Sequence, residues 1–157
     1  TLFPYTTLFR SADYEVSWEE AKKPEHQKIR NYVKAWNEFY KKHPALYRED
    51  FLEQGFEWIS TLDADHSIIV FMRKSEEDDE KLLVVCNFTP VVYDNFKVGV
   101  PLEGKYKEIF NSDKTEFGGL GVTNPRKISS KPMPWDGREN SITLDVPPMG
   151  ISVLIYE

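Results

Sequence analysis

The sequence is poor in the residues that build disulfides and metal sites, with one cysteine and three histidines among 157 residues. Cys86 has no second cysteine with which to form a disulfide or a zinc site, and its apolar neighbours predict a small buried side chain in a reducing compartment. The histidines, His26, His43 and His66, lack the His-Glu or His-Cys spacing of a metal site and are interpreted as surface or capping residues. We therefore expect no metal and no cofactor.

Net positive charge and long apolar runs are also lacking. The 26 acidic residues outnumber the 20 basic ones, which gives a net charge of −6, and five acids occupy positions 76 to 80. Such a chain repels a phosphate backbone, and no stretch approaches the roughly 20 apolar residues that span a bilayer. These features predict a cytoplasmic protein that binds neither nucleic acid nor membrane.

Recognisable catalytic motifs are missing as well. The glycine cluster at 118 to 121 is followed by Val122-Thr123 and not by the Lys-Ser/Thr of a phosphate-binding loop, so it is interpreted as a bend, with contact to a sugar as the alternative. A working acid/base pair needs one carboxyl with a raised pKa in a partly dry cleft, and no pair of acids shows such a pattern. The sequence assigns no catalytic residue.

The first eleven residues, Thr1 to Ser11, differ in polarity from the rest of the chain. They lack an initiator methionine, a basic region and a cleavage site, so they do not form a signal peptide. They resemble translated adapter sequence from DNA sequencing, and we expect native sequence to start near Ala12, with an ordinary N-terminal strand as the alternative.

Residues 24 to 42 are predicted to form one amphipathic helix. At about 100° per residue, the apolar side chains fall in a stripe about 120° wide. The stripe comprises Ile29, Tyr32, Val33, Trp36, Phe39 and Tyr40. Pro24 suits a first helical turn, and His43-Pro44 ends the helix because the residue before a proline disfavours α geometry. A brief turn is expected at 45 to 48.

After about residue 55 the apolar period changes from 3.6 to 2. Candidate strands lie near 56 to 60, 67 to 73, 82 to 88, 96 to 100, 105 to 110, 141 to 146 and 151 to 156. Short loops at 63 to 65 and 75 to 80 are expected to join hairpins. Seven strands without an intervening helix predict a mainly β fold, an antiparallel sandwich preceded by one helix.

The hairpin formed by strands 67 to 73 and 82 to 88 is apolar on both faces, whereas the strand at 141 to 146 alternates cleanly between apolar and polar residues. One face of the hairpin would pack on the second sheet. The helix at 24 to 42 is too short to hide all of the other face. We therefore expect a missing partner domain on the hairpin from Ile68 to Phe88, and an exposed apolar patch where that domain is absent.

Two tryptophans are candidates for stacking on a sugar ring. Trp135 lies in a loop flanked by Pro132 and Pro134 and is the best candidate for an exposed ring. Trp58 shares a strand face with Phe56, and its other interpretation is a core or domain-interface residue. Packing is the alternative role for both indoles.

Several short segments occur in a recognisable order. They are Pro24-Glu25-His26-Gln27, Tyr32-Val33-Lys34, His43-Pro44-Ala45-Leu46-Tyr47, Gly55-Phe56-Glu57-Trp58, Asn87-Phe88-Thr89-Pro90-Val91, Phe110-Asn111-Ser112-Asp113, Gly118-Gly119 with Asn124, and Pro147-Pro148. From about residue 13 to the end, this order resembles the C-terminal end of the bacterial 1,4-α-glucan (glycogen) branching enzymes of the α-amylase superfamily. Asp136 departs from the histidine expected before a Gly-Arg pair, which argues against a role for Asp136, and Met149-Gly150-Ile151 replaces a more usual Leu-Ala-Thr.

The resemblance implies a (β/α)₈ barrel that carries the catalytic carboxylates and a C-terminal sandwich behind it. On that pattern, residues 1–11 are non-native, residues 12–49 contain the last barrel helix and residues 50–157 form the sandwich. The implied parent reaction cleaves an α-1,4 glucan, holds it covalently and transfers it to a 6-hydroxyl, using two carboxylates roughly 5 Å apart. Those residues would lie upstream, so the chain alone is expected to be inactive.

The residues support three hypotheses. The first is a C-terminal piece of a branching enzyme that supports the missing barrel and meets α-glucan through the parent enzyme. The second is a free-standing glucan-binding module that uses Trp135 or Trp58 as its platform. The third is an interaction domain with no link to carbohydrate, against which the two-sided apolar hairpin argues.

Overall fold

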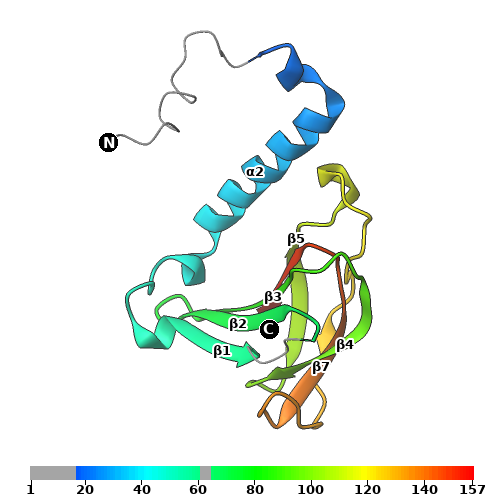
Figure 1. The fold of residues 1–157 in the computed structure, drawn as a ribbon. Helices are drawn as coiled ribbons and strands as arrows, with labels where there is room; N and C mark the ends of the chain where they lie inside the picture. The colour runs from blue at the N-terminus through cyan, green and yellow to red at the C-terminus, as the bar shows by residue number, and fades with distance from the viewer. Residues whose placement is uncertain (1–16, 61–64) are drawn as a thin grey trace, which may run out of the picture.

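The computed structural model describes residues 17–60 and 65–157, which form a mainly β fold preceded by one long helix (Figure 1). The helix is α2 (Pro24–Lys42), and the strands are β1 (Phe56–Ser60), β2 (Ile68–Ser75), β3 (Glu80–Asn87), β4 (Tyr93–Val100), β5 (Lys105–Asn111), β6 (Ile128–Ser129), β7 (Asn140–Val146) and β8 (Ile151–Tyr156). Short 3-10 helices are η1 (Glu20–Lys22), η2 (Pro44–Leu46), η3 (Glu53–Gly55) and η4 (Thr115–Phe117). The expectations for Thr1 to Ser11 and for the start of the 63 to 65 loop lie outside the described residues.

The strands form two antiparallel sheets of unequal size. The large sheet has the strand order β1-β2-β3-β8-β5-β6, and β4 pairs with β7 in a small sheet. The predicted helix and all seven predicted strands are confirmed, and β6 is an additional strand of two residues. The sandwich is also confirmed, although it is lopsided because the second sheet has only two strands.

An aliphatic core fills the space between the two sheets. Alternate residues of β2, β3 and β8 meet the inward residues of β4 and β7, since neighbouring side chains on a strand point to opposite faces. The buried members are Ile59, Ile68, Val70, Met72, Leu83, Val85, Val98, Val100, Tyr106, Ile142, Leu144, Val146 and Leu154. Tyr106 is fully buried and donates its hydroxyl hydrogen to the Leu102 carbonyl at 2.9 Å, so its polar atom is satisfied.

The opposite face of the large sheet is covered by α2 through an aromatic layer. Phe39, which is buried, stacks on Trp36 and lies 4.9 Å from Phe110 of β5, measured between ring centroids. Leu82, Val84 and Cys86 of β3, which face this side, are buried beneath the layer.

In the described part of the chain no helix is long and apolar enough to cross a membrane.

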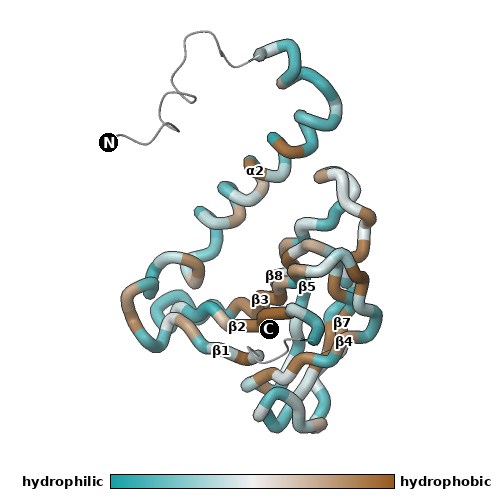
Figure 2. The backbone as a smooth tube through the Cα atoms, in the orientation of Figure 1, coloured by the Kyte–Doolittle hydropathy of each residue, from teal (hydrophilic) through white to brown (hydrophobic). Residues whose placement is uncertain are grey.

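The helix covers more of the predicted hairpin than the sequence indicated. The β3 half of the hairpin is buried on both faces, so the expected exposed patch does not extend over it. Phe71 of β2 is only half-buried, and Trp58 of β1 is exposed. Because α2 crosses the sheet at β3, β8 and β5, the apolar surface left open lies at the β1 edge. Figure 2 shows the hydrophobic segments gathered in the central strands β2, β3 and β8.

Buried polar groups join the end of α2 to the sandwich. His43 caps the helix as expected, but it is buried rather than on the surface, with its Nδ1 2.6 Å from Glu80 Oε1. The other carboxylate oxygen of Glu80 accepts a hydrogen bond from the Ala45 amide. Arg73 donates to the carbonyls of Ala45 and Leu46, so the chain leaving the helix is held on β2 and β3 by charged side chains.

Candidate functional site

Trp58 belongs to an aromatic cluster on the α2 side of the large sheet. Its ring centroid lies 4.8 Å from that of Phe56 and 5.9 Å from that of Phe71, both in edge-to-face geometry. Phe71 sits directly opposite Trp58 in the β1–β2 register. The indole nevertheless stays 53% exposed, because α2 does not reach this edge strand. The cluster is therefore packed from one side and open on the other.

Trp135 sits at the start of a two-residue hairpin turn. Its backbone pairs with that of Arg138 through two hydrogen bonds of 3.0 and 2.8 Å. The two central residues, Asp136 and Gly137, both have positive φ, which a type I′ turn requires and which Asp-Gly adopts readily. The turn explains why an aspartate is acceptable where a histidine was expected.

Two contacts fix this turn against the small sheet and the large sheet. The Asp136 carboxylate accepts a hydrogen bond of 2.9 Å from the Gly99 amide of β4, and a Cβ atom at Gly99 would overlap the Trp135 carbonyl. Arg138 Nη2 donates to the Trp58 carbonyl at 3.1 Å and lies 2.7 Å from the Glu57 carboxylate. Arg138 therefore ties the backbones of the two candidate tryptophans together, whereas no ring contact joins their indoles in the described residues.

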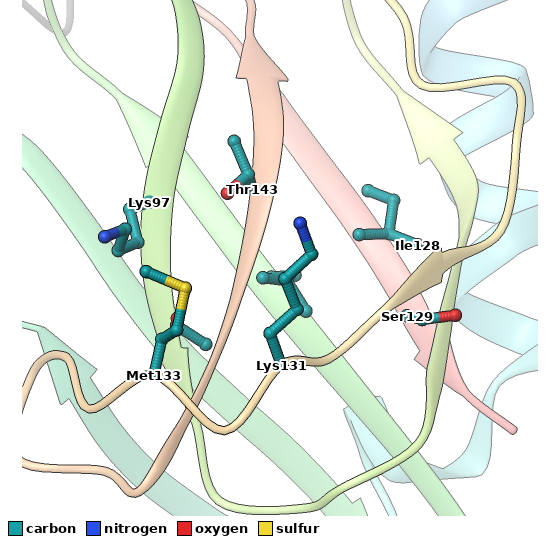
Figure 3. A pocket seen from close by; sticks show the side chains of 8 residues that line it. Lys97, Ile128, Ser129, Lys131, Met133 and Thr143 are labelled. Atoms are coloured by element: carbon teal, nitrogen blue, oxygen red, sulfur yellow. The ribbon is translucent and has the colours of Figure 1, made fainter.

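A groove of about 400 Å³ lies beside this turn, on the outer face of the small sheet (Figure 3). Its walls include Lys97 of β4, Thr143 of β7, Ser129 of β6 and, from the segment that crosses between β6 and β7, Lys131 and Met133. Lys97 and Thr143 are register partners, so both project from the same face. No carboxylate in the described part of the chain pairs with either lysine; Lys97 instead lies over the Trp135 ring, which leaves the Lys131 ammonium for a ligand.

The Trp135 ring is 47% exposed and is linked to the groove through Lys97, which is one of the groove's walls. The Lys97 ammonium lies 4.8 Å from the centre of that ring, which is within the range of a cation–π contact. Lys97 therefore belongs both to the wall of the groove and to the surroundings of the Trp135 ring. The sequence singled out Trp135 correctly as exposed, and the structure adds the neighbours that surround it.

The carboxylates near Trp58 are engaged in ion pairs. Glu57 pairs with Lys74 at 3.0 Å as well as with Arg138.

Two carboxyl groups elsewhere in the described chain have lowered pKa values. A hydrogen bond from Lys81 lowers the pKa of Asp79, and one from Lys127 lowers the pKa of Glu157. General acid catalysis calls for a carboxyl with a raised pKa, so the shifted acids are suited to surface ion pairing.

The glycine cluster at 118 to 121 has a structural role in the fold. The Asp113 carboxylate accepts hydrogen bonds from the Leu120 and Val122 amides, each at 2.9 Å, so the loop wraps around it. A Cβ atom at Gly119 would overlap the Asp113 carbonyl, and Gly118 has a positive φ. These contacts agree with the bend and explain why small residues are needed there.

The sequence did not single out the residues that line the groove. Lys97 and Thr143 follow from strand alternation, which places them on the outer face of the small sheet. Lys131 and Met133 belong to an irregular segment whose path has no periodic signal. Only the backbone pairing of Lys131 with Ser141 brings that segment over the sheet.

Comparisons with known proteins agree with this architecture. Residues 58–157 match the family described as "Alpha amylase, C-terminal all-beta domain". The chain is also similar to proteins named 1,4-alpha-glucan branching enzyme GlgB. The one from Oceanobacillus iheyensis is 45% identical over 143 residues, or 91% of this chain and 22% of the relative.

Two further relatives of the same name come from distant bacteria. The protein from Marinobacter nauticus is 40% identical over 141 residues, covering 89% of this chain and 22% of the relative. The protein from Aquifex aeolicus is 40% identical over 151 residues, covering 95% of this chain and 24% of the relative. The chain thus spans between a fifth and a quarter of the length of these relatives, and the similarity includes α2 as well as the strands.

Proposed function

Because the chain belongs to the α-amylase C-terminal all-β domain family, we propose that it serves as the C-terminal domain of a 1,4-α-glucan branching enzyme, a cytoplasmic glycosyltransferase of glycogen synthesis. The observation that carries the proposal is the 45% identity with a protein of that name over 91% of the chain. In this proposal residues 12–49 end the catalytic barrel and residues 50–157 form the sandwich. The carboxylates that act on α-glucan then belong to the rest of the parent protein.

The distribution of exposed apolar side chains supports docking to a barrel. Ile29, Val33 and Tyr40 of α2 are each about half exposed or more, and at 100° per residue they fall within about 40° of one another. Phe51, in the connection from α2 to β1, is fully exposed, and Trp58 of β1 is 53% exposed. Surfaces of this kind usually mark contact with another domain.

This surface refines the contact expected from the sequence. The proposed barrel contact is the open flank of α2 and the β1 edge, with Phe71 as the contribution of the Ile68–Phe88 hairpin. The rest of that hairpin is already buried by α2 and by the small sheet. In this proposal Trp58 is a docking residue before it is a sugar contact, since its ring packs on Phe56 and Phe71.

A chimera tests the proposal. The matching segment of the Oceanobacillus iheyensis relative is replaced by this chain, and the branching of amylose is followed by the loss of iodine absorbance. We expect the chimera to be active and a deletion of the same segment to be inactive. A folded chimera that is no more active than the deletion would contradict the proposal.

The docking surface is tested in the same chimera. Val33→Asp and Trp58→Asp place a charge on the proposed contact and are expected to lower activity or the melting temperature of the chimera, because an unpaired charge is buried at an interface only at high cost. Leu120→Asp is the matched control, since Leu120 is exposed in the glycine loop. The 157-residue chain alone is expected to show no branching activity.

A second candidate function is binding of α-glucan by the sandwich itself. The observation in its favour is the half-exposed Trp135 ring on a turn that is fixed at both ends. This function is compatible with the first, because the Trp135 indole makes no ring contact with Trp58 in the described residues, although Arg138 of the turn is hydrogen-bonded to the Trp58 carbonyl.

A further inference from the structure

The groove on the outer face of the small sheet has no part in the proposed docking or chemistry. We propose that it is an accessory α-glucan-binding site, in which a pyranose ring stacks on Trp135 and the adjoining chain lies along Met133 toward Lys131 and Ser129. The choice of ligand rests on the function proposed above, whereas the site itself follows from the geometry.

The backbone around Trp135 is already restrained in the absence of a ligand. The type I′ turn restrains the backbone of Trp135, and its neighbours on the N-terminal side are two prolines, Pro132 and Pro134, around Met133. Asp136 and Arg138 fasten the turn to β4 and β1. A surface whose backbone is already ordered loses little conformational entropy on binding, which favours recognition of a flexible chain.

The groove offers the mixture of surfaces that a sugar chain requires. A pyranose has apolar C–H faces that suit an aromatic ring or a thioether, and a rim of hydroxyls that donate and accept hydrogen bonds. Trp135 and Met133 are both nearly half exposed and supply the apolar contact. Lys131, Ser129 and Thr143 supply polar groups, and the volume of about 400 Å³ lies in the range of small-ligand sites.

The location separates this site from the barrel contact. The aliphatic core lies between the two sheets, α2 covers the far side of the large sheet, and the groove opens on the far side of the small sheet. Docking on α2 and β1 would therefore leave the groove open to solvent. A glucan bound there would be held on the enzyme while another part of the same chain reached the active site, which raises its effective concentration.

Electrophoresis of the full 157-residue chain in native gels containing glycogen tests the site. We expect glycogen to retard the chain, maltoheptaose to compete, and Trp135→Ala to weaken binding at least fivefold. Met133→Ala is expected to weaken it two- to fivefold. Trp18→Ala and Met149→Ala are matched controls, because both side chains are exposed outside the groove, and they should change binding less than twofold.

Three outcomes would overturn the proposal. One is no retardation of the folded chain, and another is equal binding by Trp135→Ala and Trp18→Ala. The third is displacement by inorganic phosphate but not by maltoheptaose, which would make the lysines an anion site. Failure here is distinguishable from failure of the proposed function, because the chimera carrying Trp135→Ala would still branch amylose at high substrate concentration.

Discussion

The two faces of the large sheet are covered in different ways. The face toward β4 and β7 is aliphatic, and its core residues are 7% exposed or less. The face toward α2 is aromatic, and beside buried Phe39 it contains half-buried rings such as Tyr32, Trp36 and Phe71. The first interface is complete within this chain, whereas the second is closed at its centre and open at its margin.

Geometry explains the difference. A sheet laid on a sheet matches side chains over a broad area, so even a two-stranded sheet can seal the middle of a sandwich. A single helix is a cylinder about 10 Å wide and covers only the strands that it crosses. In the strands outside its path, Trp58 of β1 stays exposed and Phe71 of β2 is only half-buried. An incomplete layer of this kind predicts a further domain, and substitutions in each layer can compare the two.

The largest effect is expected in the aliphatic core. Leu154→Ala should lower the free energy of unfolding by about 3 to 4 kcal/mol, because it removes a fully buried side chain and leaves a cavity that the two sheets cannot close. Urea denaturation followed by circular dichroism measures the change. Leu120→Ala, at an exposed leucine, should cost less than about 0.5 kcal/mol. A loss below about 1 kcal/mol for Leu154→Ala would show that the sheets are not tightly packed.

A smaller effect is expected under the helix. Phe39→Ala should cost about 2 to 3 kcal/mol, toward the low end for a buried phenylalanine, because the surrounding rings are half-buried and can shift into the space. Tyr40→Ala, at the next and exposed helix position, is the control. If Phe39→Ala cost more than Leu154→Ala in the same urea series, the ranking of the two layers would be reversed.

Substitutions at the junction between α2 and the sandwich should lower the free energy of unfolding by less than Phe39→Ala does. Glu80→Ala leaves His43 and the Ala45 amide without their buried acceptor and should cost about 2 kcal/mol. Glu80→Gln keeps a carbonyl oxygen for one of them and should cost about half as much. Glu77→Ala, at an exposed acid of the same loop, is the control. Equal stability of Glu80→Ala and Glu77→Ala would show that the hydrogen bonds of Glu80 do not stabilise the junction.

The smallest effect concerns Cys86 under the α2 layer. Burial raises the pKa of this thiol from its ordinary value of 9.0 to about 11. Between these two values the unfolded chain loses the proton while the folded chain keeps it, so stability should fall as the pH rises from 9 to 11 and be unaffected by this group below 9. Denaturation at about pH 8 and about pH 10, compared between the wild type and Cys86→Ala, isolates the contribution. An identical pH dependence would show that the layer is permeable to water at this position.

Most of the helices and strands could be predicted from local patterns in the sequence. The helix was predicted at its observed bounds, 24 to 42, since an apolar stripe, a first-turn proline and a terminal His-Pro are all local signals. The strands β1 and β8 were also predicted at their observed bounds, and the other five predicted strands differ at their ends by three residues or fewer. The two residues of β6 have too little periodicity to be recognised, and their pairing with β5 is the sole reason that they form a strand.

The candidate site was only partly accessible to the same reasoning. The sequence singled out Trp135 as the best candidate for an exposed ring and interpreted Trp58 as a sugar contact or a core or domain-interface residue, and both side chains are about half exposed. It could not tell that Arg138 connects their backbones, because the contact joins residues 80 positions apart. The alternation of the strand at 141 to 146 predicts that Ser141 faces water, but Ser141 is buried, since the segment containing Lys131 pairs with it and covers that part of β7.

The sequence by itself determined the element types, the two-sided apolar character of the central hairpin and the family resemblance, because these depend on neighbours within a few positions. Only the tertiary structure decided which strands share a sheet, where α2 crosses it, and that the open apolar surface lies at β1 and not over the whole hairpin. It also decided that Lys97, which lies over the Trp135 ring, lines a groove. Such features depend on the path of the backbone between distant residues, and no local period encodes that path.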